Sequence, residues 1–376
     1  MPTDLCAVIE FAPDNAQYTR RMKNFLEEFL CFLKVYSLQD QAVDGGTYDA
    51  WSRVYSAASA IFTLPDTVWF VSVIKRVACK LVLLAIRIDR LSFSSAYVKT
   101  IDAAGRLSKT AGIAANDRTP AQATETKRAA VLALANLSFR AYFKLNNTRL
   151  CETVLGSVQN ALLMNRRNDT ADKSGEERYS VAERVTYRYY LGQIRLIQHR
   201  VHVGAQHLRW AFDHCTNAHV HNKRKILVPL VASYLILGRY ATPALLTRYC
   251  LREQYEALLH FHRQGNGAGV MHELEMHREW FRKRGLYMLL REKVQLGVWR
   301  NLFRRCLLLT LKASSTSTAP PTLQLAALVA PARLAWADAT LELEDMECVA
   351  VNLIDQVRNI YIGCLLYTSP SPRDRG

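Results

Sequence analysis

The ten histidines of the chain all lie between positions 199 and 277, and such clustering raises the question of a metal site. The nearest approach to a zinc-peptidase motif is HELEMH at 272–277. A zincin needs HExxH, because two histidines four positions apart share one face of a helix. Here the histidines are five positions apart, which places them roughly 140° out of alignment on a helix. The spacing therefore argues against zinc and favours satisfied or solvent-facing histidines.

Other patterns that could carry catalysis are incomplete. Two HxH pairs, at 219–221 and 260–262, resemble the metal pair of JAMM peptidases, but the serine and aspartate that must follow are absent from both. The run GNGAG at 265–269 follows no predicted strand and is not followed by GK[ST], so it is interpreted as a flexible connector between helices. No GxSxG and no plausible nucleophile–base pair is present. The sequence predicts no enzyme, no metal and no cofactor.

Basic residues are the strongest chemical signal. The chain has 49 Lys and Arg against 33 Asp and Glu, a net charge of +16. The window 278–312 holds ten basic and two acidic residues. Such density predicts a polyanionic partner, either nucleic acid or an acidic protein, with an ordinary solvated face as the alternative. The candidate nucleic-acid-binding residues are Arg282, Lys283, Arg284, Arg291, Lys293, Arg300, Arg304 and Arg305.

These residues differ in their expected roles. Arg282 to Arg284 end a predicted helix beside Gly285, where cations also suit the helix dipole. Arg300 and Arg304 are four positions apart and share a helix face, and the neighbouring aromatic stripe is interpreted as core more readily than as a base-stacking platform. The acidic run of positions 338–347 precedes the helix that would read DNA, which argues against sequence-specific recognition. We therefore expect sequence-tolerant, salt-dependent binding of RNA or DNA.

Nearly all ordered segments show apolar residues at helical spacing. The region 182–196, AERVTYRYYLGQIRL, has a Leu-Gly pair suited to close helix packing, as in tetratricopeptide-like (TPR-like) hairpins. The predicted fold is all-α, a TPR-like helical-repeat solenoid capped by a C-terminal winged helix. The predicted divisions are an N-terminal helical region 1–91, a flexible linker or loop 92–123, a helical-repeat part 124–297, a truncated winged helix 298–363 and a disordered, non-native tail 364–376.

The winged helix is predicted from three helices, 298–312, 323–330 and 342–358, followed by a strand that begins at 360. Its wing is incomplete, because the prolines of the tail preclude the second strand that the first needs for pairing. Further upstream, the apolar stretch 68–88 is interrupted by four basic residues. It is therefore predicted as a buried amphipathic helix, without a membrane association.

Three groups of residues carry a resemblance to a known family, the PCI domain-containing protein 2 family. They match AxxVTYxYYxG at 182–192, NKRxIL…LxG…LLxxY at 222–249, and YRNLF at 299–303 with tryptophan in place of the tyrosine. The resemblance runs from about residue 127 to residue 362. It implies a PCI domain, in which a helical solenoid ends in a winged helix.

The resemblance also implies a function. Members of this family look like non-enzymatic scaffolds of a nuclear transcription-export complex for mRNA. They bind a large PCI scaffold protein through the winged helix and a small acidic proteasome-lid-type protein along their helices. It implies a nuclear location, at the pore or envelope, with a cytoplasmic fraction as an alternative, and a basic nucleic-acid platform near Arg300, Arg304 and Arg305. The alternative reading is a structural PCI subunit of a signalosome-like or proteasome-lid-like complex without nucleic-acid binding.

Overall fold

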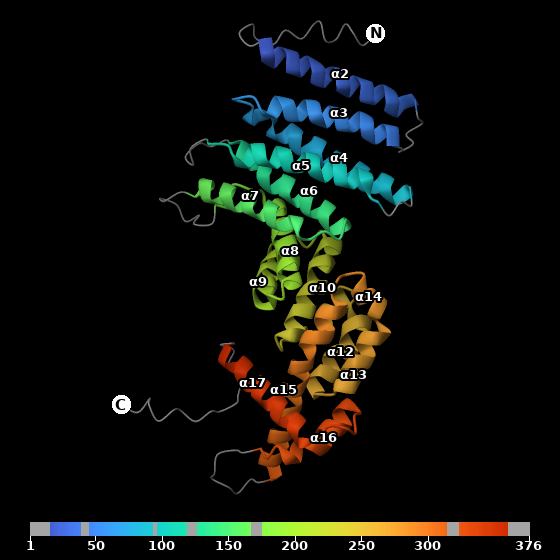
Figure 1. Ribbon diagram of the computed structural model, residues 1–376, viewed down its shortest axis with the longest axis vertical. Helices are drawn as coiled ribbons and strands as arrows, with labels where there is room; N and C mark the ends of the chain where they lie inside the picture. Colours follow the sequence, from blue (N-terminus) through green and yellow to red (C-terminus); the bar gives the residue numbers. More distant parts are fainter. Residues whose placement is uncertain are drawn as a thin grey trace, which may run out of the picture. The chain divides into compact units, whose positions relative to one another are not determined.

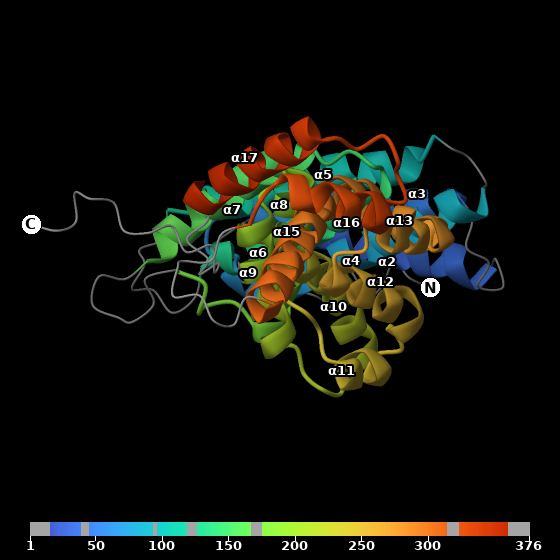
Figure 2. The ribbon, with the colours of Figure 1, turned by 90° about the horizontal axis from the view of Figure 1, so that it is seen from below.

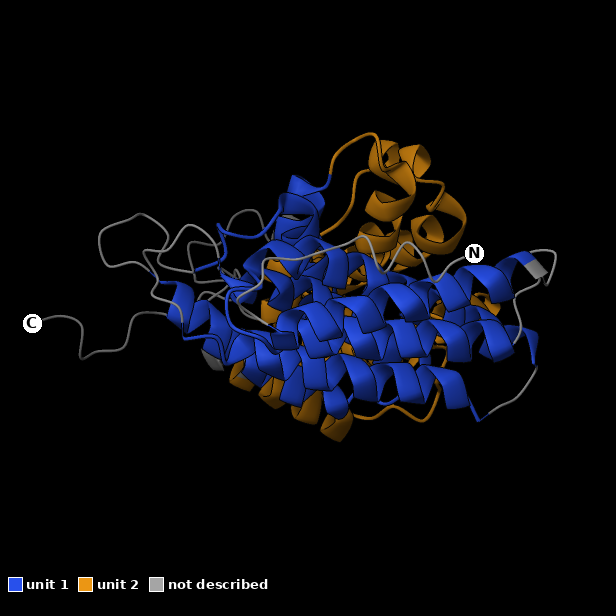
Figure 3. Ribbon diagram, turned by 90° about the horizontal axis from the view of Figure 1, so that it is seen from above, with its two compact units in different colours: residues 1–194, 209–215 blue, residues 195–208, 216–376 orange. Residues whose placement is uncertain are grey.

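The computed structural model describes residues 16–38, 45–92, 96–118, 126–166, 175–313 and 323–359. Within these ranges every regular element is a helix and there is no strand, so the predicted all-α class is confirmed. The described chain divides into two compact units (Figure 3). Unit 1 comprises residues 1–194 and 209–215, and unit 2 comprises residues 195–208 and 216–376. The two divisions predicted inside the solenoid and winged-helix part, 124–297 and 298–363, stay predictions.

Unit 1 is a stack of helices that follow one another along the chain (Figure 1). Its elements are α2 (Ala16–Leu38), α3 (Gly45–Phe62), η1 (Val68–Phe70), α4 (Val71–Leu91), α5 (Val98–Ala115), η2 (Lys127–Ala130), α6 (Val131–Lys144), α7 (Leu150–Asn165), most of α8 (Val181–Ile197) and the end of α9 (Val201–His214). From α3 to α7, each helix packs against the next one and against the next but one. This nearest-neighbour pattern is typical of an α-solenoid, as predicted.

The amphipathic helix predicted at 68–88 corresponds to η1 and α4. Ile74, Ala78 and Leu81 on α4 are fully buried, whereas Arg76 and Arg87 lie on the exposed side. Burial of one stripe and solvation of the other explains how a stretch so rich in apolar residues can include four cations. Across the described ranges, no helix has the length and apolar character that a membrane crossing would need.

The predicted linker at 92–123 is wrong for most of its length, because α5 occupies residues 98–115. Its small residues are packing surface: Ala103 and Ala114 are fully buried, and Leu107 lies between them. Small side chains let neighbouring helices approach closely, so a segment poor in large apolar residues can still be core. Asp89 on α4 secures the start of α5, since its carboxylate accepts hydrogen bonds from the Thr100 amide at 2.7 Å and the Thr100 hydroxyl at 2.6 Å.

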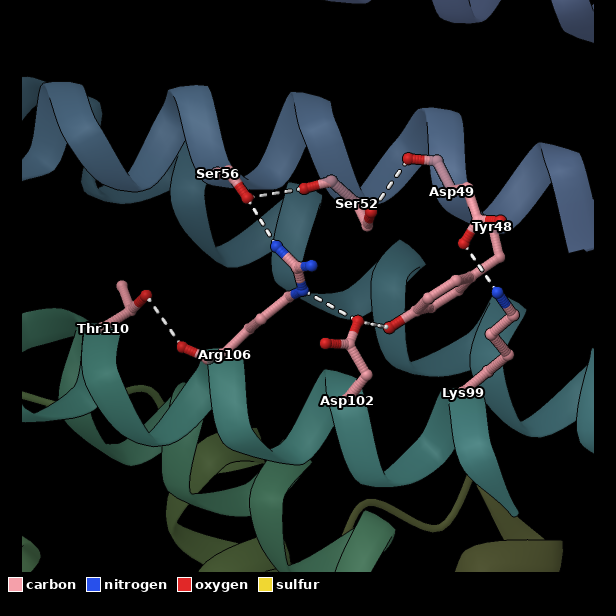
Figure 4. Close-up of polar contacts among 8 residues, drawn as sticks. All are labelled: Tyr48, Asp49, Ser52, Ser56, Lys99, Asp102, Arg106 and Thr110. Atoms are coloured by element: carbon pink, nitrogen blue, oxygen red, sulfur yellow. Dashed lines mark hydrogen bonds and ion pairs between the residues drawn. The ribbon is translucent and has the colours of Figure 1, made fainter. Parts of the chain in front are cut away.

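A seam of polar side chains joins α3 to α5 (Figure 4). The Asp102 carboxylate accepts hydrogen bonds from the Tyr48 hydroxyl at 2.7 Å and from the Arg106 guanidinium at 2.8 Å. Arg106 also donates to the Ser56 hydroxyl at 2.6 Å, which ties the same guanidinium to α3. Asp102 thus links a buried tyrosine of one helix to an arginine of the next turn, so the register of the two helices depends on its charge.

Asp102 should make the stability of unit 1 depend on pH. Burial raises the pKa of its carboxyl, but the hydrogen bonds from Arg106 and Tyr48 outweigh burial and leave the pKa below its usual value. Such a group stabilises the fold above its unfolded pKa of about 3.9, and this contribution is lost as pH falls through the folded value. We expect Asp102→Asn to lower the urea midpoint at pH 7 and to differ less from the wild type near pH 3. Asp213→Asn, which breaks an exposed pair on α9, should change the midpoint little at either pH.

Unit 2 is arranged around one long helix. Besides the end of α8 and the first part of α9, its elements are α10 (Val220–Ile236), α11 (Pro243–Arg248), α12 (Arg252–Gln264), α13 (Gly267–Met276), α14 (Arg278–Arg282), α15 (Tyr287–Ala313), α16 (Ala326–Trp336) and α17 (Leu343–Asn359). The helix α15 packs against α10, α12, α13, α14, α16 and α17. Figure 2 shows α16 and α17 beside α15. The first predicted winged-helix segment, 298–312, is therefore the second half of a helix that begins eleven residues earlier.

The second half of α15 forms a small apolar core with α16 and α17. Leu302, Leu328, Ala332 and Met346 are its buried residues. Two of the three predicted helices are confirmed with shifted bounds, since α16 extends to Trp336 and α17 ends at Asn359. This is the three-helix part of the predicted winged helix. The predicted strand at 360–362 and the predicted tail at 364–376 lie outside the described residues.

Candidate nucleic-acid interface

Helix α15 positions most of the predicted basic residues. Val294, Val298 and Leu302 recur every four residues and form one buried stripe of the helix. The remaining faces of the helix are therefore left for polar side chains. On those faces Arg304 and Arg305 are exposed, whereas Arg300 is only half-exposed. Arg300 and Arg304 lie four residues apart on this helix and therefore share a face, as their spacing predicted. Their surroundings differ, because Arg304 is exposed and Arg300 is only half-exposed.

Arg300 lies against the end of α10. A methyl group added at Gly238 would stand 2.1 Å from one terminal nitrogen of the Arg300 guanidinium. Gly238 also has φ +73°, a left-handed conformation that terminates the helix and that favours glycine. Glycine is therefore favoured at position 238 for two reasons: the backbone has a positive φ there, and a larger side chain would collide with Arg300. Gly238 and Arg300 come from two different motifs of the family resemblance, and the fold brings them into contact.

Beside this contact, a hydrogen-bonded group joins three elements of unit 2. The side-chain amide of Asn301 donates to the Tyr240 hydroxyl at 2.9 Å and to the backbone carbonyl of His262 at 2.8 Å. The Tyr240 hydroxyl lies 2.9 Å from Nδ1 of His262. His262 is fully buried, and burial together with the positive charge of Arg300 lowers its pKa to about 4. The imidazole is therefore neutral at physiological pH, and these polar contacts persist there.

The positive charges of three guanidinium groups act on Tyr240. Arg263 lies over its ring, 4.5 Å from guanidinium carbon to ring centroid, and is exposed. Burial raises the pKa of the Tyr240 hydroxyl, while the charges of Arg300, Arg263 and Arg304 oppose that shift. We call Tyr240, Arg263, Arg300 and Arg304 the Tyr240 arginine cluster. Several cations around one partly buried phenol form a surface suited to phosphate oxygens, because guanidinium binds them by paired hydrogen bonds.

Arg305 extends this surface, since it donates to the backbone carbonyl of Gln264 at 3.4 Å. Arg291 and Lys293 are exposed nearer the start of α15, and no ion pair of the described residues involves them. These placements extend the positive charge of the Tyr240 arginine cluster along α15.

The predicted residues at the end of α14 are placed differently. Arg284 lies over the Trp280 ring at 3.7 Å and donates to the backbone carbonyl of Trp280 at 2.7 Å. Arg282 lies 3.5 Å from Glu279, and Lys283 is exposed at the helix end. Arg284 therefore satisfies a carbonyl of the last turn, which agrees with the predicted capping role. Among the described contacts, none joins these three residues to the Tyr240 arginine cluster.

The aromatic residues of α15 belong to the core, as predicted. Trp299 stacks on Trp336 with ring centroids 4.8 Å apart and meets Phe303 edge-on at 6.2 Å. A methyl group at Gly267 would stand 2.3 Å from the Trp336 ring. Of the glycine run at 265–269, only Gly265 and Asn266 connect helices, because α13 begins at Gly267. Its prediction as flexible is wrong, because Gly265 and Gly267 are in close contact with α15 and α16.

The first turn of α17 is acidic, with Glu344 and Asp345 exposed. Asp345 accepts a hydrogen bond from the Glu342 amide at 2.9 Å, so part of this acidity serves the helix start. A negatively charged N-terminus does not fit insertion into a major groove, which agrees with the prediction of sequence-tolerant contacts. Among the residues that the structure describes, no group of three or more His, Cys, Asp or Glu side chains could hold a metal ion.

Sequence reasoning missed Tyr240, His262 and Arg263 as members of the site. None of the three stands in the basic window, and nothing in their spacing connects them to α15. The only available signal was the pair of family motifs that contain Gly238 and Arg300. Those motifs would have pointed to α10 and α15 as neighbours, but not to the arginine on α12.

Comparison with known proteins gives the family. The chain is 30% identical over 350 residues to a PCI domain-containing protein of Schizosaccharomyces pombe, covering 89% of this chain and 75% of that protein. It is 28% identical over 230 residues to PCI domain-containing protein 2 of Xenopus laevis, covering 61% of this chain and 52% of that protein. It is 27% identical over 361 residues to enhanced ethylene response protein 5 of Arabidopsis thaliana, covering 95% of this chain and 81% of that protein.

No protein-family model matches the chain. The chain spans three quarters of the fission-yeast relative and about half of the frog relative. None of the three relatives carries the name of an enzyme. Together with the helical stack and its three-helix end, these similarities show that the chain belongs to the PCI domain-containing protein 2 family.

Proposed function

We propose that the protein is a non-enzymatic scaffold that binds nucleic acid within a nuclear mRNA-export complex and so couples transcription to export. The Tyr240 arginine cluster carries this proposal, because it gathers cations from α12 and α15 around one phenol. Cations fixed in this way bind phosphates without reading bases. Family membership supports the scaffold role, since PCI proteins act as subunits of multiprotein complexes.

The proposed partners follow from the family. A large PCI scaffold protein would bind the winged-helix end, a small acidic proteasome-lid-type protein would bind along the helices, and RNA or DNA would bind the basic surface. The proposed location is nuclear, at the pore or envelope. Neither a cofactor nor a membrane enters the proposal.

A second candidate is a structural PCI subunit of a signalosome-like or proteasome-lid-like complex. The observation that favours it is the apolar surface near the end of the described chain. Leu334 on α16 is 85% exposed and Val351 on α17 is 65% exposed. Large apolar side chains with such exposure fit a protein partner better than a nucleic acid.

The test is binding of a labelled single-stranded RNA across a salt series. The variant Arg263→Glu/Arg304→Glu/Arg305→Glu changes three exposed side chains, so it should fold normally. Each phosphate contact contributes about 0.7 to the slope of log affinity against log salt, so we expect the slope to fall by about 2. We also expect affinity at low salt to fall by roughly two orders of magnitude, since three attractive charges become repulsive.

The matched control is Arg87→Glu/Arg90→Glu/Arg118→Glu, which makes the same charge change at exposed positions of unit 1. It should retain most of the affinity and the slope of the wild type. Equal losses in the two triple variants would mean that net charge alone governs binding. An unaltered protein that binds no RNA at low salt, but binds the acidic partner, would favour the second candidate.

A further inference from the structure

The ammonium group of Lys80 lies inside a cage of aromatic rings in unit 1. Its nitrogen is 4.4 Å from the centroid of the Trp51 ring, 4.5 Å from that of Phe32 and 5.4 Å from that of Tyr36. Lys80 stands on α4, Trp51 on α3, and the other two rings on α2. The rings hold one another: Phe32 meets Trp51 edge-on at 4.6 Å and stacks with Tyr36 at 5.6 Å.

This lysine differs from its neighbours in having no polar partner among the residues that the structure describes. Lys75, one turn earlier on the same helix, pairs with Glu183 at 2.7 Å, and Lys99 pairs with Asp49 at 2.6 Å. No described hydrogen bond or ion pair involves the Lys80 ammonium, which is half-buried. An ammonium with three N–H donors is poorly matched to such a site, because ring faces attract its charge but replace few of its hydrogen bonds to water.

The distances suit a methylated cation. A methyl carbon stands about 1.5 Å from its nitrogen and meets a ring carbon at roughly 3.5–4.0 Å. A nitrogen 4.4–5.4 Å from three ring centroids therefore leaves space for methyl groups directed between the rings, or toward Tyr36, the most distant of the three. Each methyl would replace an N–H donor that lacks a protein acceptor, while the positive charge and its attraction to the rings remain.

We propose that Lys80 is a site of lysine methylation and that Phe32, Tyr36 and Trp51 hold the methylated ammonium. The methyl donor is a sulfonium compound such as S-adenosylmethionine, bound by a separate methyltransferase. The ammonium first releases a proton to solvent. The amine nitrogen then attacks the methyl carbon, so that the new N–C bond forms as the S–C bond breaks and a neutral thioether leaves. Burial lowers the pKa of Lys80, which raises the fraction of the reactive neutral amine.

The position of the cage connects methylation to the packing of α2. This is the first described helix of the stack, and α3 is its main packing partner. The outermost helix of a stack opens at low free energy, and opening of α2 would expose Lys80 to a methyltransferase. After modification, two of the three rings that hold the methylated cation belong to α2. Methylation should therefore favour the docked state of α2.

Two measurements test the proposal. The first is mass spectrometry of the full-length protein recovered from the organism that encodes it, with a protease that does not cleave at lysine. We expect one to three methyl groups on Lys80 and none on Lys75. Finding Lys80 unmethylated there would overturn the assignment of the site.

The second measurement is amide hydrogen exchange after reductive dimethylation of bacterially expressed protein. The matched control is Lys80→Arg treated in the same way, because its other lysines are modified equally and its charge is kept. We expect dimethylation to slow exchange in α2 about two- to fivefold in the wild type but not in Lys80→Arg. Equal effects in the two proteins would show that the cage does not hold the methylated cation and would overturn the proposal.

Discussion

Gly267→Ala should lower the free energy of unfolding of unit 2 by about 2–3 kcal/mol, because the added methyl group overpacks the contact between α13 and α16. The new carbon would stand 2.3–2.5 Å from three atoms of the Trp336 ring. That ring cannot retreat freely, since it is stacked with Trp299 at a centroid distance of 4.8 Å. Urea unfolding would give the loss, and hydrogen exchange should accelerate most in α16.

Gly156→Ala is the matched control, because the same methyl group in the middle of α7 would meet nothing within 4 Å. There the substitution should raise stability by about 0.5–1 kcal/mol, since alanine loses less backbone entropy in a helix. The two variants are thus expected to change stability in opposite directions. Similar small gains in both would contradict the close contact at Trp336.

Arg128→Met should lower the free energy of unfolding of unit 1 by about 3 kcal/mol, because it leaves buried acceptors without donors. The Arg128 side chain is fully buried. It donates to the Asn165 side chain at 2.8 Å and to the backbone carbonyl of Asp117. Asn165 in turn donates to the Tyr179 hydroxyl at 3.2 Å, so one guanidinium organises contacts among η2, α7 and the approach to α8. Methionine retains the length of the side chain but none of its donors.

Urea unfolding monitored by circular dichroism would measure the effect. Arg118→Met serves as the control, because Arg118 is exposed and makes no described side-chain contact. It should change stability by less than about 0.5 kcal/mol. Equal unfolding midpoints for the two variants would show that the buried hydrogen bonds of Arg128 contribute little.

Periodicity predicted most of the helices because it reports burial of one face. It gave α9 its bounds and placed α7 within one residue. It failed at α5, whose buried face is built from alanine and threonine with a single leucine, and a face of small residues has little contrast with a loop. Whether a small residue is buried depends on the helix that packs against it, and the sequence of one segment does not contain that information.

The candidate site, like the fold, was predicted only in part from the sequence. Charge density identified α15, and the helix does present its arginines there. Tyr240 and Arg263 were out of reach, because their roles depend on α10 and α12 meeting α15. A basic window also hides differences among its members: Arg284 satisfies a helix end, whereas Arg304 faces solvent. The sequence could predict where positive charge gathers, but not which cations are already engaged.

The division of the chain into units has a consequence for its synthesis. Unit 1 contains residues 209–215 in addition to 1–194, and residues 195–208 between them belong to unit 2. Trp210, over which Arg188 lies at 5.2 Å, therefore leaves the ribosome after a stretch of the other unit. The nascent chain cannot complete its first unit until residue 215 has emerged. A nascent chain that has emerged only as far as residues 195–208 would display a helical stack in which Arg188 still lacks Trp210.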